Sequence, residues 1–370
     1  MFQFDRRLLE NFDWILLSLV LALAGLGILN LYSASSGYHT GGIPVYSKQA
    51  YLLVLGLVAM AFILLFDYHY LKDWAYLLYG IGLILLLVVL ILGRITSGAQ
   101  RWIDLGLFSF QPSELAKVVV IIALAKYYGR REYPSGLGFR ALFGPALLVG
   151  APFLLILIQP DLGTAMHLAL TCLSILLILR IRPSVILTLS ATLAVALPFV
   201  WLYLLKDYQR DRIFTFLDPE RDPLGAGYHI IQSKIAVGSG QFWGKGFMKG
   251  TQSQLRFLPE QHTDFAFSVF AEEWGFSGCV VLLTLFLLLI LCGLNIAQRS
   301  QDRFGGLLAL GLTVLIFWQF LINISMVTGL MPVVGIPLPF ISYGGTSLVT
   351  TLVSIGILLN ISMRRFMFQE

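Results

Sequence analysis

Three carboxylic acids stand where apolar stretches of the sequence begin, and each is accompanied by other polar residues. They are Glu114 within residues 111–117, Asp161 within residues 159–164, and Asp264 within residues 258–265. A carboxylate in such a position can act as a general base, or it can simply cap the helix that follows. For each acid taken alone, both interpretations remain open.

Glu114 and Lys117 are three residues apart, so both lie on one face of a helix that Pro112 or Ser113 would begin. In a structural role, the glutamate would suit the helix dipole and the lysine would extend to the membrane surface. A lysine near a helix N-terminus opposes that dipole, however, and this one lies a turn inside an apolar helix. The spacing therefore favours an ion pair that lines a polar cavity, with Arg101 nearby.

Positive potential would surround the three carboxylates if their helices start on the same face of a membrane, because helix N-termini attract anions. Nearby bases would add to it, namely Arg101, Lys117, Lys234, Lys245, Lys249 and Arg256. This combination suits an anionic headgroup, above all a phosphate, with one carboxylate left to act as a base. Glu260 and His262 are further candidates for substrate binding, or they are simply solvated. No second histidine stands three or four residues from His262, so a metal site there is only weakly indicated.

Residues 329–347 hold three prolines and four glycines and no acidic or basic side chain. Such a segment cannot form a regular helix, and irregular backbone at membrane depth must pack against protein or line a cavity. We expect a re-entrant or packed loop at the outer edge. It would serve packing alone or cradle a lipid chain.

Composition places the chain in a membrane. Of its 370 residues, 58% are hydrophobic and 12% are charged, whereas a soluble domain carries about a quarter charged residues. The surface must therefore face lipid. The net charge of +5 comes from bases scattered over short loops, which does not indicate a nucleic-acid partner. The three cysteines lie in apolar runs, without a CxxC pair or a histidine at metal spacing.

The hydrophobic runs predict an all-α polytopic membrane protein that forms a single domain over residues 1–370. About ten stretches reach the length of a spanning helix, roughly 17–25 residues. They are residues 13–33, 48–66, 73–93, 113–129, 141–159, 162–180, 184–205, 265–294, 304–330 and 346–363. The first stretch exceeds the roughly 7–15 apolar residues of a secretory signal, so we interpret it as an uncleaved anchor.

Basic residues are concentrated in one set of short loops, which should therefore be cytoplasmic. Both termini then lie inside, and one large loop, about residues 206–263, lies outside. Within it Tyr228, Ile231 and Ile235 recur at helical spacing, which predicts a short amphipathic helix.

Taken together, the motifs resemble those of the SEDS family (shape, elongation, division and sporulation). They are GAQRWI from residue 98, QPSELAK from 111, QPDLGT from 159, LPEQHTDF from 258 and GIPLPFISYGG from 335. The resemblance covers essentially the whole chain, with the motifs in the expected order. Residues 246–260 resemble the elongation branch of the family rather than its division branch.

The resemblance implies a ten-span glycosyltransferase that polymerises lipid II on the outer side of the cytoplasmic (inner) membrane, and hence a role in peptidoglycan synthesis and cell shape. It implies a class B penicillin-binding protein, a transpeptidase, as partner, together with other elongation-complex membrane proteins. Asp264 matches the family's essential aspartate, while Arg101, Glu114, Lys117 and Asp161 match positions lining a central polar cavity. A divalent cation, Mg or Mn, is a plausible cofactor, and no organic cofactor is expected.

Both lines of inference fit one mechanism, in which Asp264 is a general base whose pKa is raised by partial burial. The principal alternative is a lipid II flippase, because ten spans around a polar cavity also suit a transporter. A flippase should carry polar groups through the whole bilayer, whereas these motifs are expected on one face. A non-catalytic scaffold is a third possibility, but it leaves the acid–base residues without a role.

Overall fold

The computed structural model describes residues 11–36, 43–96, 99–104, 109–130, 136–204, 207–222, 225–255, 257–258 and 260–365. Ten long helices within them coincide with the ten predicted spans. They are α2 (Trp14–Ser35), α3 (Val45–Leu64), α4 (His69–Leu92), α5 (Pro112–Gly129), α6 (Phe139–Ile158), α7 (Leu162–Ile178), α8 (Pro183–Phe199), α12 (Ala266–Arg299), α13 (Arg303–Val327) and α14 (Gly345–Arg364). The prediction of an all-helical polytopic membrane protein is confirmed.

Eight of these regions are long and apolar enough to cross a membrane by length and hydropathy alone. The other two are α5, which carries Glu114, Lys117 and Lys126, and α7, which has 17 residues. Charge and length make these two helices weaker spanning signals. Helix α5 is enclosed by other helices along most of its length, and α7 buries the face that carries His167, which explains why polar groups are tolerated in them.

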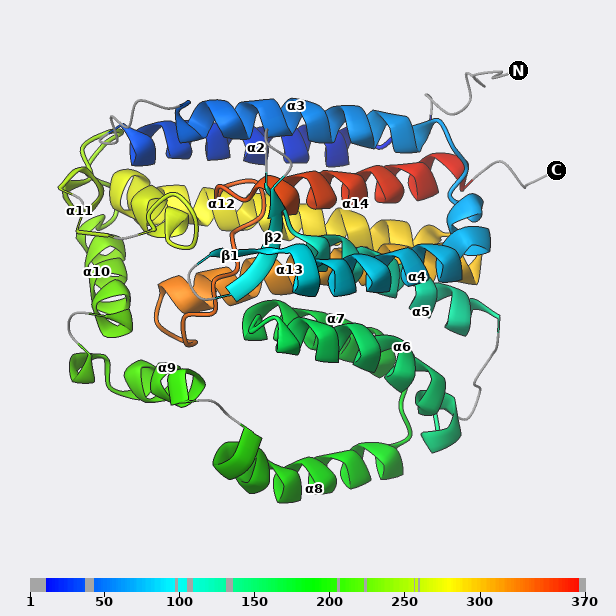
Figure 1. Cartoon of the computed structure of the whole chain (residues 1–370). Coiled ribbons are helices and arrows are strands. Elements are labelled where there is room, and N and C mark those ends of the chain that lie inside the picture. Colours follow the sequence, from blue (N-terminus) through cyan, green and yellow to red (C-terminus); the bar gives the residue numbers. More distant parts are fainter. Residues whose placement is uncertain are drawn as a thin grey trace.

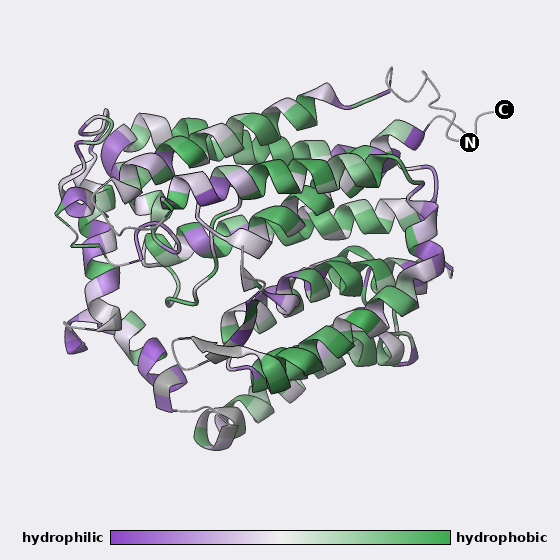
Figure 2. Cartoon of the chain, turned by 45° about the horizontal axis from the view of Figure 1, so that its top comes forward, coloured by the Kyte–Doolittle hydropathy of each residue, from purple (hydrophilic) through white to green (hydrophobic). Residues whose placement is uncertain are grey.

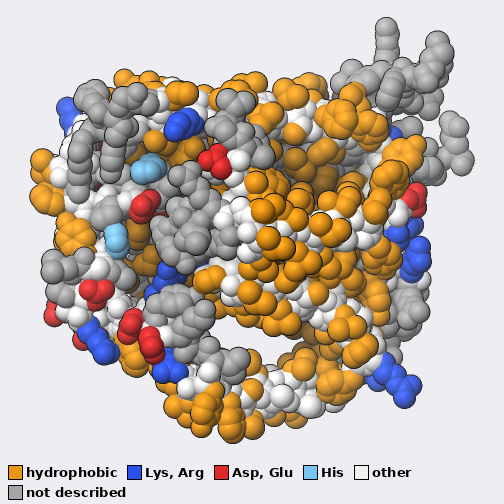
Figure 3. All heavy atoms as spheres, in the orientation of Figure 1, with side chains coloured by type: hydrophobic (Ala, Val, Ile, Leu, Met, Phe, Trp, Pro, Cys, Tyr) orange, Lys and Arg blue, Asp and Glu red, His pale blue; other side chains and the backbone are white. Residues whose placement is uncertain are grey.

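The bundle is apolar both inside and outside. Helices α13 and α14 are buried along most of their length, whereas α3, α4 and α6 turn many large apolar side chains outward. Figure 2 shows hydrophilic residues concentrated at the two ends of the helices, with hydrophobic residues between them. Figure 3 shows the same belt of hydrophobic side chains on the molecular surface. Such a surface is expected for a protein whose outer side chains face lipid.

Helix α8 stands apart from the other spanning helices. Val185 is its only buried residue among those whose side chains are described, and an opening separates α8 from the bundle (Figures 1 and 3). It continues into a short π-helical segment, Val200–Leu204.

The segment between α8 and α12 contains the predicted short helix, which is α10 (Ala226–Ser239). It also contains α9 (Asp207–Leu217), a 3₁₀ turn (Pro219–Arg221) and α11 (Thr251–Gln254), which the sequence pattern did not predict. Between α4 and α5 lies a small antiparallel sheet of β1 (Arg94–Thr96), β2 (Ala99–Asp104) and β3 (Ser109–Phe110), in that order. This sheet is an addition to the all-α prediction, and β2 packs beside α4 and α5.

The start of α2 and the end of α14 lie at one end of the bundle, while α10 and α11 lie at the other (Figure 1). An even number of spans requires the first span to start and the last span to end on the same side. The end that carries α10 and α11 is hereafter called the loop end.

Candidate active site

Residues 329–347 lead from the end of α13 into the first turn of α14 at the loop end. A Cβ placed on Gly163, in the first turn of α7, would lie 2.4 Å from the carbonyl oxygen of Val334. A Cβ placed on the next residue, Gly335, would lie 3.5 Å from Oδ2 of Asp264. Because consecutive Cα atoms are about 3.8 Å apart, the start of α7 and Asp264 flank a single stretch of this loop. The predicted irregular segment is therefore part of the site.

The backbone around Asp264 is fixed from α13. Asn323 Nδ2 donates to the carbonyl oxygens of Asp264, at 3.0 Å, and of Ile336, at 2.8 Å. The amide of Tyr343 donates to the carbonyl of His262 at 2.8 Å. One asparagine thus ties the aspartate and the loop together, and a second bond holds the loop to the residues just before it.

Asp264 is not a helix cap. Helix α12 begins at Ala266, and its N-cap residue is Phe265, which makes no side-chain cap bond. The capping interpretation of Asp264 is therefore wrong, because the acid stands one residue too early. Its half-buried carboxylate makes no hydrogen bond or ion pair within the described residues. It is thus available to accept a proton.

Burial, helped by the neighbouring charge of Glu260 and opposed by the guanidinium of Arg212, raises the pKa of Asp264 from 3.8 to about 6. The expected upward shift is confirmed in direction. A carboxylic acid of this pKa is ionised near neutral pH and is still basic enough to take a proton in a reaction. Arg212 comes from α9, and its Nη1 donates to the carbonyl of Val333 at 3.3 Å. No motif or spacing in the sequence indicated Arg212.

Glu114 and Lys117 form the predicted ion pair, with Nζ of the lysine 2.8 Å from Oε1 of the glutamate. Both are buried, at 6% and 2% exposure. Nζ of Lys117 also lies 3.1 Å from Nδ1 of His167, and Nε2 of that histidine lies 2.9 Å from the carbonyl of Leu315. The ammonium can only donate and the carbonyl can only accept, so the imidazole carries its proton on Nε2. His167 was missed, although it stands six residues after Asp161 in an apolar helix.

Asp161 caps α7, as one interpretation expected. Its Oδ1 accepts from the amide of Thr164 at 3.2 Å, and its Oδ2 accepts from that residue's hydroxyl at 2.9 Å. Gln111 Nε2 donates to it at 3.2 Å, and Arg101 Nη1 lies 3.6 Å away. Arg101 also donates to the carbonyl of Pro160. These bonds hold the sheet, the start of α5 and the α6–α7 turn together. Asp161 and Arg101 therefore serve mainly to stabilise the fold at this point.

The remaining predicted residues lie around the same end of the bundle. Lys234 is exposed on α10, and its side chain packs against Gly329. A Cβ added to that glycine would lie 2.0 Å from Cε of Lys234. Glu260 is exposed, and its Oε2 accepts from Thr263 Oγ1 at 2.9 Å. His262 is half-buried, and burial lowers its pKa although the charge of Glu260 opposes this. Arg256 lies outside the described residues.

The expected divalent cation has no site with three protein ligands among the described residues. Among the described residues, no group of three or more histidine, cysteine, aspartate or glutamate side chains could hold an ion. Within this part of the chain, the side chains do not form a cation site built from three protein ligands.

Two buried acids that the sequence analysis missed hold the loop between α10 and α12. Oε1 of Glu272 accepts from Lys245 Nζ at 2.7 Å and from the amide of Gln252 at 3.0 Å. Glu273 accepts a hydrogen bond from Ser33 on α2. Both acids are at most 2% exposed. The detectable signal was a pair of adjacent acids inside an apolar run, two turns after Asp264.

The Glu272→Gln substitution should loosen this loop, because it removes the charge that the ammonium of Lys245 neutralises. Losing hydrogen bonds to a charged group costs about 1.5–3 kcal/mol. Hydrogen exchange should speed up over residues 245–252, and substitution of the exposed Glu220 by glutamine should leave it unchanged. Equal protection in native protein and Glu272→Gln would rule out this role.

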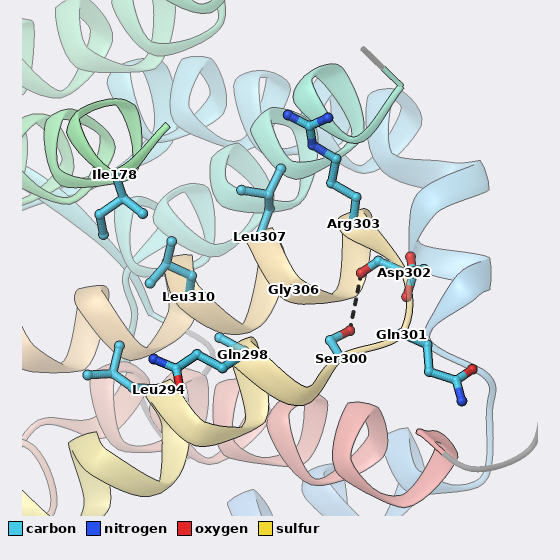
Figure 4. A pocket seen from close by; sticks show the side chains of 11 residues that line it. Ile178, Leu294, Gln298, Ser300, Gln301, Asp302, Arg303, Gly306, Leu307 and Leu310 are labelled. Carbon is cyan, nitrogen blue, oxygen red and sulfur yellow. Dashed lines mark hydrogen bonds between the residues drawn. The ribbon is translucent and has the colours of Figure 1, made fainter. Parts of the chain in front are cut away.

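Two hollows elsewhere contain none of the predicted site residues. One, of about 570 Å³, lies at the α12–α13 turn, where Gln298, Ser300 and Arg303 form its polar edge (Figure 4). The other, of about 990 Å³, lies along α3, α4, α5 and α14. The chemistry predicted from the sequence does not belong to either.

Comparison with known proteins agrees with the motif analysis. The family model for cell cycle proteins FtsW, RodA and SpoVE matches residues 13–366. The peptidoglycan glycosyltransferase MrdB of Escherichia coli K12 is 43% identical over 365 residues, which span 97% of this chain and 96% of that protein. A chain from a peptidoglycan synthase complex that coordinates polymerization and crosslinking superposes with a TM-score of 0.83 at 35% identity, covering 97% of this chain and 99% of that one. The rod shape determining protein RodA of Thermus thermophilus gives a TM-score of 0.71 at 31% identity, with coverages of 96% and 98%.

Proposed function

The chain belongs to the FtsW/RodA/SpoVE family and is a multi-pass membrane peptidoglycan glycosyltransferase, and from this premise we propose that it polymerises lipid II with Asp264 as general base. One observation carries the assignment of the base. Asp264 has a half-buried carboxylate without a side-chain partner within the described residues, and its pKa is raised to about 6. The other two acids predicted near helix starts, Glu114 and Asp161, are engaged in an ion pair and a helix cap.

In the proposed step, Asp264 takes the proton from the 4-hydroxyl of the GlcNAc of one lipid II. That oxygen forms a bond to the anomeric carbon of the MurNAc of the other substrate, and the bond from this carbon to undecaprenyl diphosphate breaks. An α-linked donor that yields a β-linked polymer reacts with inversion, so one base and an activated leaving group suffice. A general base contributes roughly 10²–10⁴ in rate, and positioning and charge stabilisation must supply the rest.

Cationic side chains would stabilise the diphosphate as it leaves. Arg212 is suitably placed, because it is close enough for its charge to lower the pKa of Asp264. Lys117 keeps one N–H without a partner within the described residues after its bonds to Glu114 and His167. Lys234, Lys245 and Lys249 belong to the same outer segment and would attract the anionic headgroup.

The reaction would take place on the outer face of the cytoplasmic membrane. The short loops rich in lysine and arginine indicate the cytoplasmic side, and the three acids lie at the opposite, loop end. Residues 246–260 resemble the elongation branch, which favours a role in elongation and rod shape. A class B penicillin-binding protein would be the partner, since a similar chain belongs to a complex that coordinates polymerization and crosslinking.

Polymerisation can be tested with purified protein, co-expressed with its penicillin-binding partner and supplied with lipid II while a β-lactam blocks crosslinking. Glycan strands are expected as product. If no polymer forms and lipid II instead crosses the bilayer of reconstituted vesicles, the flippase would be the better assignment.

The proposal also predicts a pH dependence. Polymerisation should rise as the pH passes through about 6, where Asp264 ionises. The folded-state pKa lies above the ordinary value of 3.8, so the contribution of this carboxyl to stability is fully present below 3.8 and is lost as the pH rises through about 6. Activity and stability should therefore change in opposite directions across this window.

Two substitutions should move the activity profile in opposite directions. Arg212→Gln removes an opposing positive charge and should shift it to higher pH, whereas Glu260→Gln removes a negative charge and should shift it to lower pH. The measurement is kcat/KM over about two pH units on either side of the midpoint. A midpoint that neither substitution moves would exclude Asp264 as the titrating group.

A further inference from the structure

His167 is fully buried in α7 and takes no part in the chemistry proposed above, yet its ring bridges two helices. It lies between the ammonium of Lys117 on α5, at 3.1 Å, and the carbonyl of Leu315 on α13, at 2.9 Å. We propose that His167 is a positioning residue that holds the Lys117 ammonium in the orientation needed for polymerisation. This inference rests on the function proposed above.

The hydrogen bonds of Lys117 show what the histidine contributes. The ammonium has three N–H groups. One bonds to Glu114 and one to His167, and the third has no partner within the described residues. Two fixed bonds in different directions determine where the third N–H points, whereas a single bond leaves the group free to rotate. Since Lys117 is only 2% exposed, water cannot readily replace a lost acceptor.

The position of His167 connects it to the rest of the site. It stands six residues after Asp161, about 9 Å along the helix axis. Gly163 in the first turn of the same helix packs against Val334, and a Cβ added to the following loop residue, Gly335, would lie 3.5 Å from Oδ2 of Asp264. The orientation of Lys117 is thus fixed by α7, whose first turn contacts the loop beside the proposed base.

Two amide substitutions separate the two bonds of the imidazole. In His167→Asn, the side-chain oxygen can take the place of Nδ1 and accept from Lys117, while the bond to Leu315 is lost. In His167→Gln, the longer amide can take the place of Nε2 and donate to Leu315, while the acceptor for Lys117 is lost. His167→Leu removes both bonds at similar volume.

The test measures kcat and KM for lipid II in the complex with the penicillin-binding partner, together with the thermal stability of each variant. His167→Gln and His167→Leu should lower kcat roughly tenfold, the usual effect of losing a hydrogen bond to a charged group, and should change KM less. His167→Asn should retain most of the native kcat. Thr171→Val is a matched control, since the hydroxyl of this buried residue, one turn further along α7, donates to the carbonyl of His167 at 2.8 Å rather than to Lys117, and it should keep the native kcat.

The outcomes separate this inference from the function beneath it. If native protein polymerises lipid II but the asparagine variant is as impaired as the leucine variant, or all variants match native protein, His167 does not position Lys117. If kcat follows thermal stability across the variants rather than the presence of an acceptor, the role is only structural and the inference is overturned. If native protein makes no polymer, the proposed function itself fails and the inference fails with it.

Discussion

The Asp264→Asn variant is expected to lose polymerisation by a factor of roughly 10²–10⁴, the range that a general base contributes. Asparagine has nearly the same shape, but its amide cannot take a proton at the reacting hydroxyl. The bonds that place this residue come from its backbone carbonyl, which accepts from Asn323, so they survive the substitution. The assay is glycan strand formation from lipid II in the complex with the penicillin-binding partner.

Stability should move the other way in this variant. The raised pKa of Asp264 means that burying its ionised form costs free energy at neutral pH. Asparagine removes that cost, so thermal unfolding should occur at the same temperature or higher than in native protein. Asp207→Asn is a suitable control, because Asp207 lies on α9 with its side chain 99% exposed. Substantial polymerisation by a folded Asp264→Asn protein would show that another group is the base.

The second large effect is expected at the Glu114–Lys117 pair. Lys117→Met would leave the carboxylate of Glu114 buried without its cation, and breaking one side of a buried pair typically costs about 3–5 kcal/mol. Glu114→Gln would leave the ammonium with His167 as its principal acceptor. Both variants should unfold at clearly lower temperature and should make little polymer.

The double variant Glu114→Gln, Lys117→Met gives this prediction its control. With both charges removed, no isolated ion remains in the bundle, so much of the lost stability should return. Polymerisation should not return if the ammonium acts on the diphosphate. A double variant whose destabilisation equals the sum of the two single effects would show that the pair is not coupled. Recovery of activity together with stability would reduce the pair to a structural role.

The fold was largely predictable from the sequence, because the signal for a spanning helix is local. A run of about 20 apolar residues crosses a membrane as a helix in almost any context, and all ten predicted spans coincide with helices. The weak spans α5 and α7 were still found, since few charges interrupt them. The sheet around Arg101 was not predicted, because its strands are at most six residues long.

The site was predictable only in part. Motifs placed Glu114, Lys117, Asp161 and Asp264 at helix starts, and one spacing rule identified the ion pair, since residues three apart share a helix face. The same local rules could not decide which acid is a cap. Asp161 and Asp264 both precede an apolar helix, yet only Asp161 reaches the amide of the third residue after it. That difference depends on where each helix begins.

The sequence by itself determined which residues form the spanning helices and which acids stand close to helix starts, because both depend on neighbours along the chain. Only the tertiary structure decided which of those acids keeps its carboxylate unbonded. It also brought Arg212 from α9 to Asp264 and placed His167 from α7 against Lys117. These interactions, one through charge and one through a hydrogen bond, join residues about 50 positions apart in the chain. No periodicity or spacing encodes them, because they arise when separate helices pack together.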